Sequence, residues 1–255
     1  MSATSIHAEA ERLRLATTTS TENSGLLAEL HPVFEKQYGI KVDVIAVGTG
    51  KALKLGENGD VDLVMVHAPV AEKRFVENGY GVNRLSLMHN DFVILGPSND
   101  PADLKDSSSI KEAFNKLQTT GAIFVSRGDD SGTHKKENAI WQKVDIKPEG
   151  KWYLSVGQSM GAVIKIADDK QAYTLSDRGT YLAYKNKVDL KILFQGSEEL
   201  LNPYHVILVN PERHPHIKEK LAEDYISFIR GSEGQRIIRD FKIQGEALFI
   251  PDVVK

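Results

Sequence analysis

Short apolar runs and longer segments of helical periodicity alternate along the first third of the chain. Residues 12–17 alternate apolar and polar side chains as a half-buried strand does, and the apolar positions from 24 to 34 recur at helical spacing. The same order of strand and helix then repeats, with strands predicted at 41–47 and 61–66 and helices at 49–57 and 70–78. This alternation over so few residues predicts parallel βαβ units with helices on both faces of a sheet.

A turn cluster at residues 96–101, Gly-Pro-Ser-Asn-Asp-Pro, follows a predicted strand at 90–95 and is the strongest boundary signal in the chain. A second series begins after it. This series has predicted strands at 122–126, 152–156, 172–175, 190–194 and 204–209, and predicted helices at 109–118, 131–143, 158–168 and 178–185. Amphipathic helices at 216–230 and 232–241 complete the pattern, which therefore predicts an α/β protein throughout.

The last third of the chain holds too few strands for a third domain. The sequence therefore predicts two lobes, with lobe I at residues 11–90 plus 205–255 and lobe II at residues 91–204. The chain would cross between the lobes twice, and two crossings make a hinge. Residues 1–10 are rich in small side chains, and we interpret them as a leader remnant or a disordered start.

Composition and charge exclude several classes of protein. The chain has 255 residues, of which 41% are hydrophobic and 26% charged, as is ordinary for a globular protein. Its net charge of -3 and its scattered basic residues give no electrostatic footprint for nucleic acid. The absence of cysteine excludes disulfides and thiolate sites, and the histidines do not recur at metal-ligand spacing, so we predict no metal. No apolar run reaches the roughly 18–20 residues of a membrane span.

Five hydroxyl side chains at residues 17–21 leave a predicted strand and enter a predicted helix. In parallel α/β folds this position is the carboxyl edge of the sheet, where ligands bind and where the N–H groups of a helix start favour an anion. The alternative is a capping turn, but capping accounts for only one or two of the hydroxyls. We therefore favour a ligand-binding turn here.

A second cluster, Ser-Arg-Gly-Asp-Asp-Ser-Gly-Thr-His at residues 126–134, also lies between a predicted strand and a predicted helix. Arg127 adds a guanidinium whose donors lie in a fixed fork suited to an oxyanion. Asp129 and Asp130 would repel a dianion unless they turn away to orient Arg127. The alternative is again a capping turn, here with an Asp–Arg pair on the surface.

A third strand-to-helix turn, residues 157–161, matches the G-x-S-x-G pattern of the α/β-hydrolase nucleophile elbow. A serine hydrolase built on Ser159 is therefore the alternative function. No His-Gly-Gly-Gly oxyanion segment precedes this turn, and an enzyme of this kind would leave the hydroxyl-rich turns without a role. Chain order permits as partners Asp177 or Asp189 together with His205, His214 or His216.

Four segments together closely resemble the tungstate-binding proteins of bacterial ABC uptake systems. They are Ala-Thr-Thr-Thr-Ser-Thr at 16–21 with Ser-Gly-Leu-Leu at 24–27, Phe-Val-Ser-Arg-Gly-Asp-Asp-Ser-Gly-Thr-His at 124–134, Gly-Gln-Ser-Met-Gly at 157–161, and Tyr-Thr-Leu-Ser-Asp-Arg-Gly-Thr-Tyr at 173–181. The likeness covers nearly the whole chain from residue 12 on, and the first two motifs are the specific ones. It implies an α/β fold of the type II periplasmic-binding-protein class. In that class each of two lobes is a mainly parallel sheet flanked by helices, and the lobes close on one oxyanion.

The resemblance also implies which residues bind the anion. The distinctive motifs place Thr19, Ser20, Arg127 and Thr133 in the site. Topological position, rather than a distinctive motif, adds Thr49, His67, Val156 and Thr174. One departure from the family is that the chain shows no complete export signal and no lipidation cysteine.

The function implied by the resemblance is capture of tungstate, or of molybdate, by a periplasmic or membrane-tethered receptor outside the cytoplasm. The receptor would pass the ion to an ABC permease with a separate ATPase, and it would perform no chemistry and need no cofactor. We expect a monomer without a nucleic-acid partner. The donors suit this ligand, because a fully deprotonated dianion offers only acceptors, whereas phosphate retains a proton and would prefer a carboxylate. A receptor for another oxyanion such as phosphate remains an alternative, as does the serine hydrolase.

Overall fold

A computed structural model describes residues 11–253 of the chain, so the predicted leader remnant at 1–10 lies outside the described residues. The chain divides into two compact units. The first contains the described residues up to His89, then Pro203–Phe241 and the described residues from Phe249 on, and the second contains Asn90–Asn202 and Lys242–Leu248. Two long strands, β4 (Gly81–Gly96) and β9 (Leu201–Val209), run through two of the four points where the chain passes from one unit to the other, whereas two crossings were predicted.

The first unit is built on a mixed sheet in which β1 (Arg12–Thr18) lies between β2 (Lys41–Val47) and β3 (Leu63–Val66). Both neighbours run parallel to β1. Beyond β3 the sheet continues with β9, antiparallel to β3, then with β4 and finally with β12 (Ile250–Pro251), antiparallel to β4. Because β1, β2 and β3 are parallel, the segments that follow them emerge at the same edge of the sheet.

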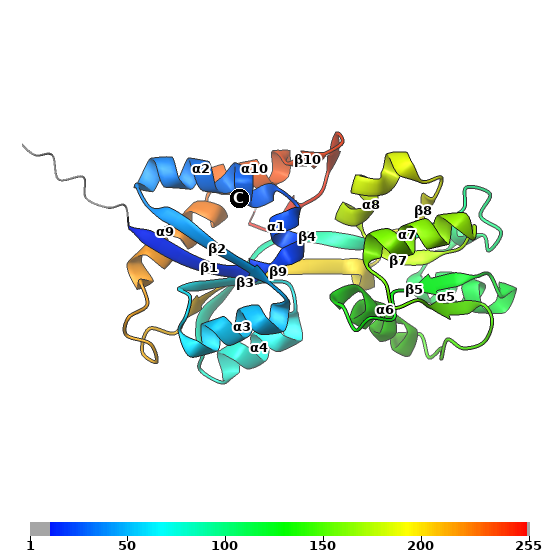
Figure 1. Ribbon diagram of the computed structural model, residues 1–255, viewed down its shortest axis with the longest axis horizontal. Coiled ribbons are helices and arrows are strands. Elements are labelled where there is room, and N and C mark those ends of the chain that lie inside the picture. The colour runs from blue at the N-terminus through cyan, green and yellow to red at the C-terminus, as the bar shows by residue number, and fades with distance from the viewer. Residues whose placement is uncertain (1–10, 254–255) are drawn as a thin grey trace, which may run out of the picture. The chain divides into compact units, whose positions relative to one another are not determined.

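Helices cover both faces of this sheet (Figure 1). On one face α2 (Leu26–Tyr38), α9 (Glu219–Arg230) and α10 (Ser232–Asp240) pack against one another, and on the other face α3 (Thr49–Asn58) packs against α4 (Pro69–Glu77). The apolar residues of α2 that the sequence pattern singled out are buried, namely Leu26, Leu27, Leu30 and Phe34. Helical periodicity therefore identified the face of α2 that meets the sheet.

The hydroxyl cluster forms a helix of its own, which the sequence analysis did not predict. Residues Thr19–Asn23 make α1, a single turn capped by the Thr18 hydroxyl, which accepts the Thr21 N–H. Gly25 then separates α1 from α2 with a φ of 87°, a left-handed conformation that glycine adopts without steric cost. The apolar period begins only at α2, which is why the pattern gave one helix rather than two.

The second unit buries both faces of the latter half of β4. Phe92 and Ile94 belong to a core shared with α5 (Ile110–Thr120) and α6 (Gly132–Lys143). Val93 and Leu95 point to the other face, into a core shared with α7 (Met160–Asp169) and α8 (Arg178–Tyr184). Side chains alternate across a strand, so this run of apolar residues serves two cores.

Strand directions in the second unit are mixed rather than mainly parallel. β5 (Phe124–Ser126) and β6 (Tyr153–Ser155) are parallel, whereas β7 (Thr174–Asp177) and β8 (Lys191–Phe194) both pair antiparallel with β4. The α/β class holds, but the expectation of mainly parallel sheets does not describe the strands around β4 and β9. The reason is that strands which carry the chain from one unit to the other run against their neighbours.

One C-terminal segment differs from the predicted lobe boundaries, which assigned residues 205–255 to lobe I throughout. Lys242–Leu248 belongs to the second unit, where β10 (Lys242–Ile243) and β11 (Glu246–Ala247) form a small antiparallel hairpin. The Lys185 ammonium pairs with Glu246, and Asn186 Nδ2 donates to Gln244 Oε1 at 3.0 Å. These polar contacts, together with packing of β10 on α8, hold the hairpin to the second unit.

Candidate functional site

The hydroxyl cluster of the first unit forms a hydrogen-bonded network at the carboxyl ends of β1 and β3. Thr18 ends β1 and is 4% exposed. Its Oγ1 lies 2.7 Å from Thr21 Oγ1 and 3.0 Å from Ser20 Oγ. The Nε2 atom of His67, the residue after β3, lies 3.2 Å from Thr18 Oγ1 and 3.3 Å from Ser20 Oγ. Three hydroxyls and one imidazole are therefore connected at one edge of the sheet.

An aromatic ring fixes the orientation of the His67 side chain. The rings of His67 and Tyr204 are stacked, with centroids 4.6 Å apart and an interplanar angle of 30°. Tyr204 lies on β9, is 2% exposed, and meets Phe249 edge-on with ring centroids 5.6 Å apart. Tyr204 is not recognisable from sequence as a site residue, because nothing in its local pattern separates it from the other aromatic residues of buried strands.

The four site residues predicted in the first unit all follow the carboxyl ends of neighbouring strands. Thr49 begins α3 directly after β2, and Gly48 before it provides no side-chain cap, so the first N–H groups of α3 lack a capping acceptor. Ser20 and His67 take part in the network just described. Thr19 is the first residue of α1, and its side chain is exposed. The hydrogen-bonded threonines of the network are instead Thr18 and Thr21.

In the second unit Arg127 is held by the carboxylate of Asp129. The guanidinium donates to Asp129 Oδ2 through Nε at 3.2 Å and through an Nη at 2.5 Å, and Asp129 Oδ1 accepts the Ser131 N–H at 3.2 Å. Burial alone would raise the pKa of Asp129, but the hydrogen bonds from Ser131 and Arg127 outweigh burial and lower that pKa. Asp129 is thus a charged partner that orients Arg127, which leaves the remaining guanidinium donors directed elsewhere.

The second acidic residue of this cluster has a different role. Asp130 has a φ of 58°, its backbone N–H donates to His134 Nδ1 at 3.0 Å, and its exposed carboxylate pairs with Lys135 at 3.2 Å. Helix α6 follows, with Ser131 as its cap and Thr133 buried in its first turn at 7% exposure. The cluster is therefore both a helix cap and a turn that orients an arginine, so the two sequence interpretations are not exclusive.

The turns that follow β5 and β6 are joined by backbone hydrogen bonds. The Val156 N–H donates to Ser126 O and the Gln158 N–H donates to Arg127 O, each at 3.2 Å. Gly128 lies so close to β6 that a Cβ atom there would be 1.9 Å from Ser155 Oγ. Val156 thus lies beside the Arg127 turn, and its N–H group has a protein acceptor.

The hydroxyl of Thr174 already has an acceptor on β5. Thr174 begins β7, is 1% exposed, and its hydroxyl donates to Val125 O at 2.7 Å. A threonine hydroxyl has a single proton to donate, and here the protein backbone accepts it. In this structure Thr174 ties β7 to β5.

The residues proposed for a serine hydrolase each have a structural role within their own unit. Ser159 is the N-cap of α7, with an unstrained φ of -63° and ψ of 155° rather than the strained turn of a nucleophile elbow. The candidate acid Asp177 caps α8 by accepting the Thr180 N–H at 2.8 Å. The candidate histidines have other partners in the first unit, where His205 contacts Glu72 and Arg84, His214 contacts Glu57 O, and His216 contacts Gly59 O.

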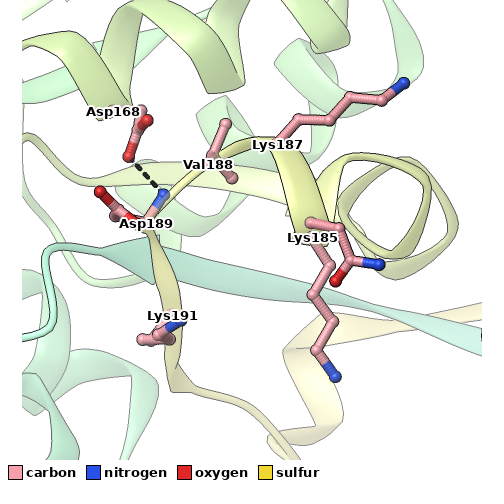
Figure 2. Close-up of a pocket in the computed structure, with 7 residues that line it drawn as sticks. Asp168, Lys185, Lys187, Val188, Asp189 and Lys191 are labelled. Carbon is pink, nitrogen blue, oxygen red and sulfur yellow. Dashed lines mark hydrogen bonds between the residues drawn. The ribbon is translucent and has the colours of Figure 1, made fainter.

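One cavity of the second unit is lined by residues outside these turns. It has a volume of about 380 Å³ and adjoins the loop between α8 and β8. Figure 2 shows the ammonium groups of Lys185, Lys187 and Lys191 pointing away from one another, so they do not converge on a ligand. Among residues 11–253, no group of three or more His, Asp or Glu side chains could hold a metal ion. None of the helices in this part of the chain has the length and apolar composition of a membrane span.

Comparison with known proteins finds similarity along nearly the entire chain. The family model of the PBP superfamily domain matches residues 5–233. The tungstate-binding protein TupA of Peptoclostridium acidaminophilum is 45% identical over 245 residues, which cover 94% of this chain and 86% of that protein.

Two solved structures are similar to this chain in fold as well as in sequence. The tungstate-binding protein TupA of Desulfovibrio alaskensis G20 has a TM-score of 0.91 at 47% identity, with 95% of this chain and 99% of that chain covered. The tungstate ABC transporter structure from Geobacter sulfurreducens has a TM-score of 0.79 at 54% identity, with 92% of this chain and 100% of that chain covered. The similarity therefore extends over both units and does not depend on single motifs.

Proposed function

Because this chain belongs to the family of tungstate-binding proteins within the PBP superfamily, we propose that it captures a tetrahedral oxyanion, most of all tungstate, for an ABC transporter. It would act outside the cytoplasm and deliver the ion to a permease driven by a separate ATPase. It would bind the ion as a monomer and without a cofactor.

The observation that carries this proposal is the donor character of the candidate turns. In the first unit Thr18, Ser20 and His67 form a network of hydroxyl and imidazole groups, beside the uncapped N–H groups at the start of α3. In the second unit the Arg127 guanidinium is oriented by Asp129. A tetrahedral dianion presents only acceptors, so hydroxyls, N–H groups and one guanidinium satisfy it without a proton acceptor.

Few formal charges are needed for such a ligand. Charge-assisted hydrogen bonds are about twice as strong as neutral ones, and the start of a helix adds a partial positive charge. Arg127 would supply the full positive charge, while Ser20 and Thr49 would supply neutral donors. This division is compatible with a chain whose net charge is -3.

A thermal-shift panel tests the proposed ligand. Purified protein would be heated with sodium tungstate, molybdate, sulfate or phosphate, with sodium chloride at equal ionic strength as the control. Ligands that bind only the folded protein raise its melting temperature with concentration. We expect a rise with tungstate and molybdate and a smaller rise, or none, with phosphate. No response to any of the four oxyanions would refute the proposed function.

A further inference from the structure

The buried carboxylate of Glu137 connects the strands from which the two candidate binding turns of the second unit emerge. Glu137 lies on α6 and is 1% exposed. Ser126 Oγ donates to its Oε2 at 2.8 Å, and Tyr153 Oη donates to its Oε1 at 2.6 Å. Trp141 Nε1 donates to Oε1 at 3.1 Å. The carboxylate therefore receives donors from β5, from β6 and from the next turn of its own helix.

Burial of an acidic group is costly unless donors compensate for it. Burial raises the pKa of Glu137, and the hydrogen bonds from Tyr153, Ser126 and Trp141 oppose that rise. A leucine at this position would fill the core without the cost of a buried polar group. Glu137 therefore has a role that apolar packing would not supply.

The positions of its hydrogen-bond partners in the sequence indicate this role. Ser126 is the last residue of β5 and is followed directly by Arg127, while Tyr153 opens β6, the strand that leads to Val156. The Val156 N–H donates to Ser126 O at 3.2 Å, so the same serine is held through its side chain and through its backbone. Thr133 lies one helical turn before Glu137 on α6 and therefore on the same side of that helix.

We propose that Glu137 is a positioning residue that fixes the Arg127 and Val156 turns relative to each other through its hydrogen bonds to Ser126 and Tyr153. This inference rests on the proposed function only where tungstate affinity is the quantity measured. Both carboxylate oxygens of Glu137 accept hydrogen bonds from protein donors inside the unit, so Glu137 would act on the anion only through the turns it holds.

The test compares Glu137→Ala with Glu137→Gln. Alanine removes every acceptor, whereas glutamine keeps the shape and can still accept from Tyr153 and Trp141 while its amide donates to the Ser126 hydroxyl. We expect Glu137→Ala to weaken tungstate binding by about tenfold or more, and Glu137→Gln to remain within about threefold of the unchanged protein. Calorimetry on the folded fraction measures both values.

Hydrogen–deuterium exchange provides a second readout that needs no ligand. In Glu137→Ala the amides of Val156 and Gln158 should exchange faster, because the turn that contains their acceptors is no longer held. Amides of β1 and β3 in the first unit should keep their rates. If tungstate fails to bind the unchanged protein, the proposed function fails, and this exchange experiment still decides the role of Glu137.

Asp62→Ala is the matched control. Asp62 is a carboxylate at 0% exposure that accepts the Arg14 and Lys218 N–H groups, and it precedes β3 at the end away from His67. Its loss should destabilise the protein but leave both tungstate affinity and the exchange of Val156 and Gln158 unchanged. Equal loss of affinity in Asp62→Ala and Glu137→Ala would overturn the proposal.

Tyr153→Phe keeps the proposal testable if Glu137→Ala does not fold. It removes one donor to Glu137 and leaves the ring packing in place, and we expect a loss of affinity of roughly twofold to fivefold with faster exchange at Val156. Unchanged affinity and unchanged exchange in this variant would overturn the proposal, as would a Glu137→Gln variant that binds no better than Glu137→Ala.

Discussion

Among single residues, Asp129 is unexpected beside Arg127, because a carboxylate repels the anion that this arginine is predicted to bind. Asp129 accepts two hydrogen bonds from the Arg127 guanidinium and one from the Ser131 N–H, so its charge is compensated within the turn. The guanidinium gains a fixed orientation in return, and orientation before binding lowers the entropy that an anion would have to offset. Carboxylate and arginine together form one preorganised donor.

Removal of the guanidinium should therefore affect binding more than folding. We expect Arg127→Ala to weaken tungstate affinity by more than about tenfold, because a charge-assisted bond to the dianion is lost. Arg127→Lys should recover only part of that loss, since an ammonium lacks the planar fork of donors. Calorimetry measures the affinities, and Lys135→Ala, which removes an exposed cation that pairs with Asp130, is the control. Affinity unchanged in Arg127→Ala would contradict this assignment.

Gly128 is the residue of this turn at which a side chain is least tolerated. Its φ is 61°, and a Cβ atom would meet Ser155 Oγ at 1.9 Å. Gly121 has a similar φ of 64° but nothing within 4 Å, so it isolates the cost of the backbone conformation. We expect Gly128→Ala to lower the free energy of unfolding by about 1–3 kcal/mol, and by more than Gly121→Ala does. Equal losses in urea titrations of the two variants would show that contact with Ser155 is unimportant.

Sequence alone predicted candidate binding segments but could not assign the role of each side chain within them. The cluster at residues 17–21 was recognisable because five hydroxyls exceed what capping needs, yet only the structure shows that Thr18 and Thr21, rather than Thr19, share the network with His67. Thr174 was selected by topological position, and its hydroxyl proves to serve Val125 O. Which of two adjacent side chains faces a partner depends on tertiary contacts that motifs do not encode.

At the scale of helices and strands, alternation along β4 explains how one strand serves two cores. Phe92 and Ile94 face one set of helices while Val93 and Leu95 face another. The sequence predicted strand and helix types correctly here, because a continuous apolar run between turn signals is typical of a strand covered on both faces. It underestimated the length of β4, because most of residues 82–89 are not buried, with Leu87 and Met88 as the exceptions, and so this part of the strand lacks a continuous apolar run.

The contact between α2 and α9 predicts a dependence of stability on pH. His31 Nε2 lies 2.9 Å from Tyr225 Oη, and burial lowers the pKa of His31 from 6.5 to about 4 against the opposing charge of Glu35. The unfolded chain thus binds this proton more readily than the folded one. The contribution of neutral His31 to the free energy of unfolding is therefore complete above pH 6.5, and it is lost as the pH falls toward about 4.

At about 1.4 kcal/mol per pKa unit, this single group would cost the protein about 3 kcal/mol of unfolding free energy at low pH. His31→Gln keeps a hydrogen-bonding group beside Tyr225 but does not titrate. Urea unfolding of both proteins between about pH 4 and pH 7 should show a smaller acid loss in the variant. Parallel curves would mean that His31 does not contribute, because carboxylates titrating in the same range affect both proteins equally.

At the scale of the whole molecule, the chain forms two units, and each contains turns rich in hydrogen-bond donors. The sequence predicted two α/β lobes from the turn cluster at residues 96–101 and from the shortage of strands in the last third. It did not place Lys242–Leu248 in the second unit, because β10 and β11 have two residues each and carry no readable period. Short elements of this kind are positioned by contacts such as that of Lys185 with Glu246.

One tungstate ion should bind per chain, and calorimetric titration near neutral pH measures this stoichiometry. We predict saturable binding of tungstate with a stoichiometry of one, which a large excess of chloride does not abolish. Ser20→Ala in the first unit and Arg127→Ala in the second should both weaken this binding. Absence of saturable tungstate binding to the folded, unchanged protein would show that the chain is not a tungstate receptor.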